Sequence, residues 1–137
     1  MQSYLIESIA ALPAYLAFLA VMVVLVLAFA RLYLWVTPYH EFDLIKAGNT
    51  AASLSFTGAL GGFGLALHSV ANGTTVLADL VMWSLVALVS QIVVFLFLTG
   101  LLRDLRKGIE ENRVSYGVLL GGASLLTGLL NAGALSY

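Results

Sequence analysis

The chain has 137 residues, of which 61% are hydrophobic and only 9% are charged. Because soluble domains carry about 25% charged residues, this composition excludes an ordinary soluble protein, and the length fits one domain over residues 1–137. A net charge of −1 without a basic arm argues against nucleic-acid binding, and the lack of cysteine excludes disulfides, thiolate nucleophiles and cysteine-based metal sites.

Charged residues divide the chain into four apolar stretches. No basic segment precedes the first stretch, between Glu7 and Arg31, which argues against a cleavable signal peptide. The stretch between Lys46 and Asp79 has 32 residues, more than the ~20 that a membrane helix needs, and turn residues at 72–75 interrupt it. We therefore expect membrane helices over about 12–36, 48–70, 77–101 and 113–134.

The second expected helix is apolar but rich in small side chains that recur every four residues. In lipid the backbone must satisfy its own hydrogen bonds, so glycines do not break such a helix, and small residues let a neighbouring helix approach closely. We expect this helix at the centre of the bundle, with the bulkier first and third helices facing lipid. The residues expected to pack helices together are Ala51, Ser55, Gly58 and Gly62, and in the fourth helix Gly121, Ser124, Gly128 and Ala132, a row that Ser136 continues.

The two halves of the chain, about 1–71 and 72–137, follow one plan: a bulky aliphatic helix, a charged connection and a Gly-rich helix. Asn49 opens the second helix nine residues before Gly58, and Asn112 opens the fourth nine residues before Gly121. Two spans per half return the chain to the same side, so the pattern predicts a parallel repeat. The predicted fold class is an all-α membrane protein of four transmembrane helices, arranged as two parallel two-helix repeats.

All six basic residues fall around two connections, those between helices one and two and between helices three and four. The positive-inside rule makes these connections cytoplasmic, so both termini, including the aromatic Tyr137, are expected to face outward. Arg31 lies inside the first helix, where it either snorkels to the headgroups or forms a salt bridge to Glu41 or Asp43. The expected cytoplasmic anchors are Arg31, Lys46, Arg103, Arg106, Lys107 and Arg113.

Several polar side chains either support the helices or line a path for a solute. Asn49 and Asn112 are either helix caps or the mouth of a path, where two helix N-termini favour an anion. Gln91, near the middle of the third helix, either bonds to another helix or faces that path. His68 and Asp79 flank the outward turn, where they are solvated, pair, or hold a weak cation. The candidate pathway residues are Asn49, Thr50, Ser53, Gln91, Asn112 and Ser115.

The run TPYHE over 37–41, followed by DLIK over 43–46 and NTAASLSFTG over 49–58, resembles the YjfL-type family of bacterial inner-membrane proteins. The second half has NRVS over 112–115, where that family usually has Asn-Thr-Ala-Ala. The resemblance implies a four-span domain in two halves in the bacterial inner membrane, with a link to membrane stress and polyamine genes. It implies no particular activity.

We expect no enzymatic activity, cofactor or metal. GALGGFG over 58–64 is no phosphate loop, because no strand precedes it and no lysine follows it, and His40 beside Glu41 and Asp43 matches no metal motif. Two functions remain. The preferred one is a homo-oligomer that forms a passive pathway for a small ion or solute, since four spans hardly enclose one alone. The alternative is a non-conducting scaffold or accessory subunit that recruits a cytoplasmic protein partner.

Overall fold

The computed structural model describes residues 1–135, which form helices and connecting turns without strands. Four apolar segments are long enough to cross a membrane, which confirms the all-helical class and the four apolar spans; they are Gln2–Val36, Thr50–Gly73, Leu77–Leu101 and Val114–Leu135. The helices are α1 (Gln2–Ala10), α2 (Leu12–Val36), α3 (Glu41–Lys46), α4 (Thr50–Gly73), α5 (Leu77–Leu101), α6 (Leu105–Glu110) and α7 (Val114–Leu135). Ser136 and Tyr137, which the sequence placed in the small-residue row and at the outer surface, lie outside the described residues.

Two of the expected helices have different bounds, and two further helices were not expected. Helix α4 begins two residues later than expected and continues to Gly73, and α7 is displaced by one residue at each end. Residues 2–10 form an additional helix, α1, which a turn at Ala11 separates from α2 just before Pro13, a residue that cannot donate a backbone hydrogen bond. The six-residue helix α6 was not expected either.

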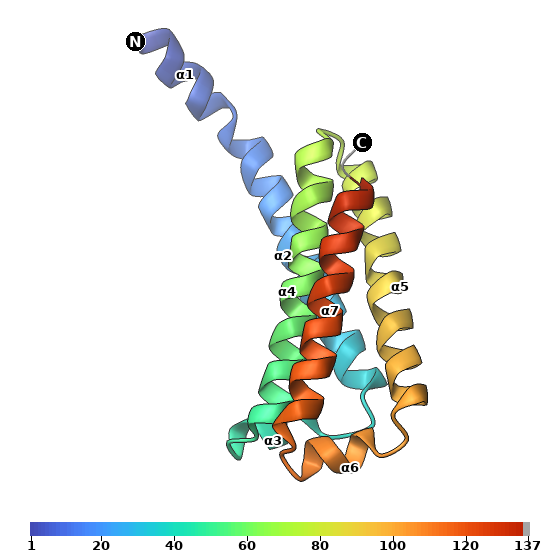
Figure 1. Ribbon diagram of the computed structural model, residues 1–137. Helices are drawn as coiled ribbons and strands as arrows, with labels where there is room; N and C mark the ends of the chain where they lie inside the picture. The colour runs from blue at the N-terminus through green and yellow to red at the C-terminus, as the bar shows by residue number, and fades with distance from the viewer. Residues whose placement is uncertain (136–137) are drawn as a thin grey trace.

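Helices α4 and α7 run side by side in the same direction, and α5 returns antiparallel beside them (Figure 1). Helix α2 crosses behind this group, while α1 and the first part of α2 diverge from it as a separate arm. Only Leu25, Phe29 and Tyr33 of α2 are buried, one per helical turn in its second half. Helix α4 is the most buried of the four spans, as expected for the central helix.

Aromatic side chains fill the space where α2, α4 and α5 meet. The rings of Phe29 and Phe63 stack with centroids 4.6 Å apart, and Tyr33 meets the edge of Phe95 at 5.1 Å. The Tyr33 hydroxyl and Ser55 Oγ form a buried hydrogen bond of 2.6 Å. This cluster fixes the second half of α2 against the bundle, because buried aromatic pairs add packing energy beyond their apolar area.

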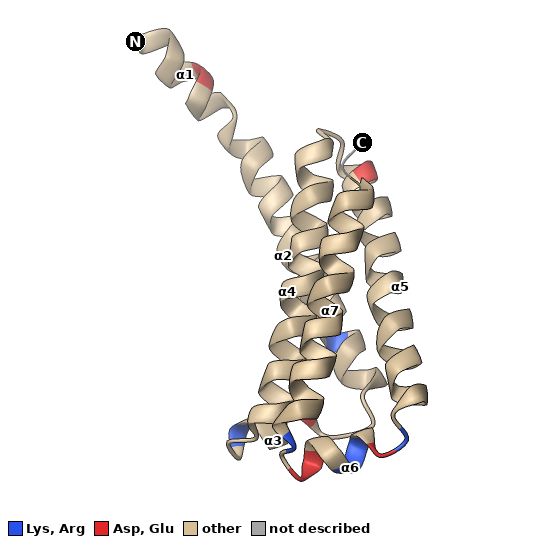
Figure 2. Ribbon diagram, viewed as in Figure 1, with Lys and Arg blue, Asp and Glu red and all other residues tan. Residues whose placement is uncertain are grey.

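Helices α3 and α6 cover one end of the bundle, which we call the basic end. Figure 2 shows Lys and Arg gathered toward this end, with several acidic residues among them. Only acidic residues, Glu7 and Asp79, mark the other end, where the chain begins and α7 finishes (Figures 1 and 2).

Candidate functional site

The contact between α4 and α7, which we call the seam, joins two backbones with no side chain between them. A Cβ atom added at Gly58 would overlap the backbone of Gly121, and one at Gly62 would overlap the carbonyl of Ser124. The same holds for Gly117 against Ala51 and for Gly128 against Gly62. At these positions only glycine fits, so the seam excludes water and solutes between the two helices.

All eight residues expected to pack helices lie along the seam of one chain. Ser55 adds its bond to Tyr33 of α2, and near the far end the Ala132 carbonyl accepts a hydrogen bond of 2.9 Å from Ser69 Oγ. The sequence interpretation missed Gly117, which is as tightly placed as Gly58. It stands four residues before Gly121, a spacing that extends the same row.

Asn49 joins the base of α4 to the second half of the chain. Its Oδ1 accepts a hydrogen bond of 2.8 Å from the amide of Ala52, which caps α4. Its Nδ2 donates at 2.7 Å to the carbonyl of Ile109, in α6. Asn49 is only 7% exposed, so both ends of its amide are used inside the protein.

Asn112, in the second half of the chain, bonds back to the first half, but it is not the structural equivalent of Asn49. Its Oδ1 accepts a hydrogen bond of 3.0 Å from the amide of Ala51, so it caps the neighbouring helix rather than its own. Its backbone is left-handed, with φ 57°, as is that of Gly48 with φ 87°. The amides of Gly48 and Asn112 donate to Ile45 and Ile109, each at 3.0 Å. By backbone conformation and backbone hydrogen bonding, therefore, Asn112 is equivalent to Gly48 and not to Asn49.

The six candidate pathway residues do not share one axis. Gln91 is buried and donates from Nε2 to the Ser124 carbonyl at 3.3 Å, beside Gly62. Gly62 stands 13 residues after Asn49, about 20 Å along α4 at 1.5 Å per residue. Ser53 Oγ donates to the Asn49 carbonyl at 3.0 Å, whereas Thr50 and Ser115 are exposed.

The most unusual polar side chain is Glu41, at the start of α3, which is only 2% exposed. Neither carboxylate oxygen has a hydrogen-bond partner among the described residues, and the buried hydroxyl of Tyr39 is likewise unpartnered. Burial raises the pKa of Glu41 to about 8, and burial together with Glu41 raises the pKa of Tyr39. The sequence interpretation gave Glu41 only as a possible salt-bridge partner of Arg31 and did not predict its burial; the described residues form no such salt bridge. The missed signal is that residues 41, 44, 45 and 48 form one face of a helix, so Glu41 shares a face with Leu44 and Ile45.

The remaining charges of the basic end form an exposed network around α6. Arg113 lies 3.8 Å from Asp104 and 3.3 Å from Glu111, and the Tyr116 hydroxyl donates to Asp104 at 2.7 Å. The hydrogen bond from the Tyr116 hydroxyl, followed by a backbone hydrogen bond and then by the charge of Arg113, holds the pKa of Asp104 below its usual range. Two further pairs, Arg106–Glu110 at 3.1 Å and Lys107–Glu111 at 3.9 Å, lie along α6. Of the other anchors, Arg31, Lys46 and Arg103 are exposed.

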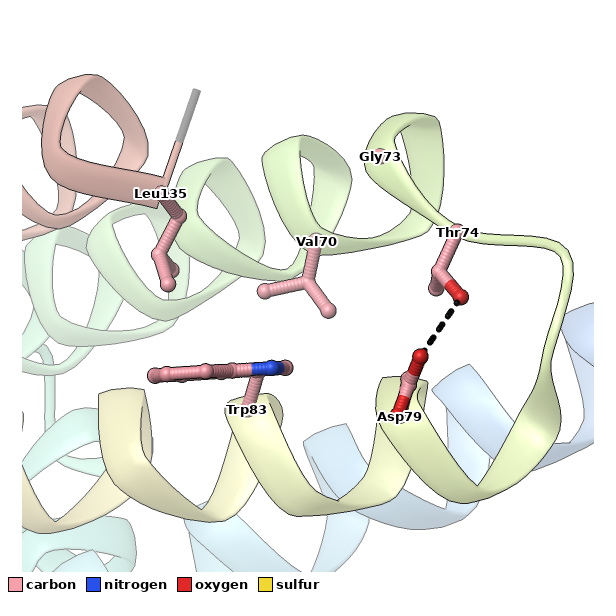
Figure 3. A pocket seen from close by; sticks show the side chains of 6 residues that line it. All are labelled: Val70, Gly73, Thr74, Asp79, Trp83 and Leu135. Carbon is pink, nitrogen blue, oxygen red and sulfur yellow. Dashed lines mark hydrogen bonds between the residues drawn. The ribbon is translucent and has the colours of Figure 1, made fainter. Parts of the chain in front are cut away.

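A small pocket of about 90 Å³ lies at the opposite end, between α4, α5 and the end of α7 (Figure 3). Thr74 Oγ1 donates to Asp79 at 3.4 Å and accepts from the amide of Val76, so it closes the turn. His68 meets Asn72 at 3.1 Å. His68 and Asp79, at this end of the bundle, are thus engaged with different neighbours, and no group of three metal-ligating side chains occurs among residues 1–135.

Comparison with known proteins identifies the relatives of this chain. Residues 7–135 match the family model described as Domain of Unknown Function (DUF350). The chain is 34% identical over 126 residues to the UPF0719 inner membrane protein YjfL of Escherichia coli (strain K12), covering 92% of this chain and 96% of the relative. The YjfL protein of Escherichia coli O157:H7 matches to the same extent. No solved structure matches.

Proposed function

Because this chain belongs to the DUF350 family, we propose that it is a multi-pass protein of the bacterial inner membrane, without enzymatic activity, that acts as a scaffold or accessory subunit for a cytoplasmic protein. The closed seam is the observation that carries this proposal. The side chains expected to line a path, Asn49, Gln91 and Asn112, bond to the backbone within one chain. A helix pair whose backbones touch leaves no room for a solute between them.

The orientation is part of the proposal. With the basic end in the cytoplasm, both α3 and α6 face the cytosol and both chain ends face the periplasm. The charged surface of α6 is exposed and carries ion pairs along the helix, while Tyr116 packs against Gly108 and ties α6 to α7. An ordered surface of this kind supports recruitment of a protein partner, because little ordering entropy is lost on binding.

The arrangement of the helices also supports the internal repeat. Helices α4 and α7 are parallel, and the short helices α3 and α6 precede them at equivalent places. Both short helices end alike: the amide of Asn49 donates to the Leu44 carbonyl at 2.9 Å, and the amide of Arg113 donates to the Gly108 carbonyl at 2.8 Å. We propose two parallel repeats related by 64 residues, one more than the spacing of the two asparagines.

The alternative is a homo-oligomer that conducts a small ion along a path between copies. The exposed Thr50, Asn112 and Ser115 at the basic end favour it, since hydroxyls and amides can coordinate a dehydrated ion. The small-residue rows do not support it, because the seam within one chain uses them. An oligomer would have to be built through the outer faces of the helices.

Ion flux into liposomes separates the two functions. We expect proteoliposomes of the wild type and of Asn112→Asp to show the same flux as empty liposomes, because neither contains a path. Flux above the empty control that becomes more cation-selective in Asn112→Asp would establish conduction and contradict the scaffold. The size of the complex in nanodiscs, measured on the same preparation, shows whether an oligomer exists to contain such a path.

A photo-crosslinking residue tests recruitment directly in cells. Placed at Lys107, which is exposed on α6, it should capture one discrete cytosolic protein. The matched control is the same residue at Leu126, which is exposed on α7 within the apolar span. Equal capture at both positions, or none at Lys107, would contradict the recruitment surface on α6.

A further inference from the structure

The Glu41 carboxyl is buried at the start of α3. Three hydroxyl side chains of the surrounding elements are also buried: Tyr39 lies in the turn before α3, Tyr33 in α2 and Ser55 in α4, and each is at most 4% exposed. Tyr33 and Tyr39 lie near Glu41, and Tyr39 lines the same cavity as Glu41. The Tyr33 hydroxyl and Ser55 bond to each other, so the two carboxylate oxygens and the Tyr39 hydroxyl remain without partners among the described residues.

Among residues 1–135, no basic side chain forms an ion pair with this carboxyl. The ion pairs of the described chain lie around α6, between Asp104 and Arg113, and none includes Glu41. On the α5 side, the ring of Phe95 packs against Tyr33. The titratable residues next to Glu41 in the sequence are all exposed; they are His40, Asp43 and Lys46. An unpaired carboxylate in such surroundings is strongly disfavoured, and a bound proton is the simplest way to remove its charge.

Protons can reach the carboxyl from the end of the bundle. A cavity of about 190 Å³ is lined by Leu34, Tyr39, His40, Glu41, Phe42 and Asp43. Since a water molecule occupies about 30 Å³ in the liquid, several waters fit there. Two of its lining residues, His40 and Asp43, are exposed, so solvent enters the cavity beside α3 and reaches the surroundings of Glu41, whose two carboxylate oxygens are themselves covered.

We propose that Glu41, with Tyr33, Tyr39 and Ser55, forms a proton-binding site that couples protonation on the cytoplasmic side to the docking of α3 against α2 and α4. With the proton bound, the carboxyl is neutral and α3 stays packed on the bundle. When the proton leaves, the carboxylate is stable only in contact with water, so α3 moves outward. Burial raises the pKa of Glu41 to about 8, which places this exchange near physiological pH. The assignment is independent of whether the protein is a scaffold or a channel.

Infrared spectroscopy of the full chain in nanodiscs tests the site. Between pH 6 and 10 we expect the carbonyl band of a protonated carboxylic acid to disappear with a midpoint near 8. The band should be absent in Glu41→Gln and unchanged in Asp43→Asn, the exposed acid on the same helix. A midpoint near 4.5, the ordinary value for Glu, or a band that persists in Glu41→Gln, overturns the proposal.

A second preparation leaves Glu41 itself untouched, in case Glu41→Gln does not fold. The chain contains four glutamates, so Glu7→Gln, Glu110→Gln and Glu111→Gln together leave Glu41 as the only one. With ¹³C-labelled glutamate, the band should shift to lower frequency and keep its midpoint. A band that does not respond to the label belongs to another group and contradicts the assignment.

Replacing Na⁺ by choline at constant ionic strength distinguishes a proton site from an alkali-ion site. We expect the midpoint to stay the same, because the only ligand is the proton. A midpoint that falls as Na⁺ is added would mean that Na⁺ competes for the carboxylate, and it would overturn the proton assignment.

Discussion

Two buried polar residues at the basic end, Asn49 and Glu41, show how differently the fold treats polar groups. Asn49 uses both its donor and its acceptor in short bonds to the backbone. Glu41 is more buried and uses neither oxygen. The first residue stabilises the connection between the two halves, whereas the second makes the fold sensitive to its protonation state.

The stability of the protein should therefore fall as pH rises. The pKa of Glu41 is raised from 4.5 to about 8, so the folded state holds this proton more tightly than the unfolded state. Its contribution is complete below about pH 4.5 and is lost as pH rises through 8, an effect of about 5 kcal/mol. Thermal unfolding in detergent at a series of pH values should show this slope in the wild type and not in Glu41→Gln. Equal slopes in both would contradict the prediction.

Replacing each asparagine by aspartate separates their roles. Asn49→Asp keeps the cap on α4 but loses the donor to Ile109 and places a charge where the side chain is 7% exposed, so we expect a loss of about 1–3 kcal/mol. Asn112→Asp keeps the acceptor for Ala51 at an exposed position and should cost less than about 1 kcal/mol. Chemical denaturation in mixed micelles compares the two. A larger loss for Asn112→Asp would mean that the Ile109 bond contributes little.

At the scale of helices, the parallel pair α4 and α7 is the rigid centre of the structure. Its closeness depends on glycines at five positions where any Cβ would overlap backbone: Gly58, Gly62, Gly117, Gly121 and Gly128. Neighbouring glycines on the same helices, such as Gly64 and Gly122, have nothing within 4 Å of an added Cβ. Both groups are glycines of the same two helices, and only their place relative to the seam distinguishes those that must be glycine from those that need not be.

Single methyl groups test the seam. Gly58→Ala should separate α4 from α7 and lower the apparent melting temperature, because the new Cβ would overlap the Gly121 backbone. Gly64→Ala, the matched control, should be neutral or stabilise α4 by up to ~1 kcal/mol, since alanine favours helix. Likewise Gly62→Leu should disrupt the fold, whereas Val24→Leu on the exposed face of α2 should not. Similar behaviour of Gly58→Ala and Gly64→Ala would show that the helices are not in backbone contact.

The sequence predicts where the membrane-spanning helices lie better than it predicts their end residues or the buried polar site around Glu41. Uninterrupted apolar runs determine the spans, and the four-residue recurrence of small residues predicts which faces of the Gly-rich helices make close contacts, because both signals are local. The apolar neighbours Leu44 and Ile45 show that Glu41 shares a helix face with them, but its burial depends on how α3 packs against α4, which a left-handed Gly48 permits. Similarly, the pairing of Asn112 with Ala51 spans 61 residues and depends on tertiary packing.

For the whole molecule, the distribution of charge gives a prediction about topology. We expect a reporter fused after residue 137 to behave as periplasmic and a tag inserted after Glu110 to be cytoplasmic, because the positive residues lie around α3 and α6. Glu110 is exposed, whereas Gly108 packs under the ring of Tyr116 and would not tolerate an insertion. A cytoplasmic signal from the reporter at the C-terminus would contradict the even number of spans.

The order of synthesis adds a consequence of the seam. Helix α4 ends at Gly73 and its partner α7 ends at Leu135, so 62 further residues must be made before the pair is complete. At 5–20 residues per second this takes about 3–12 s. During that time the glycine face of α4, the least hydrophobic of the four spans, meets lipid or the insertion machinery instead of α7. Ribosome stalling before residue 114 would therefore leave a membrane-inserted chain that insertases and quality-control proteases can recognise by its uncovered glycines.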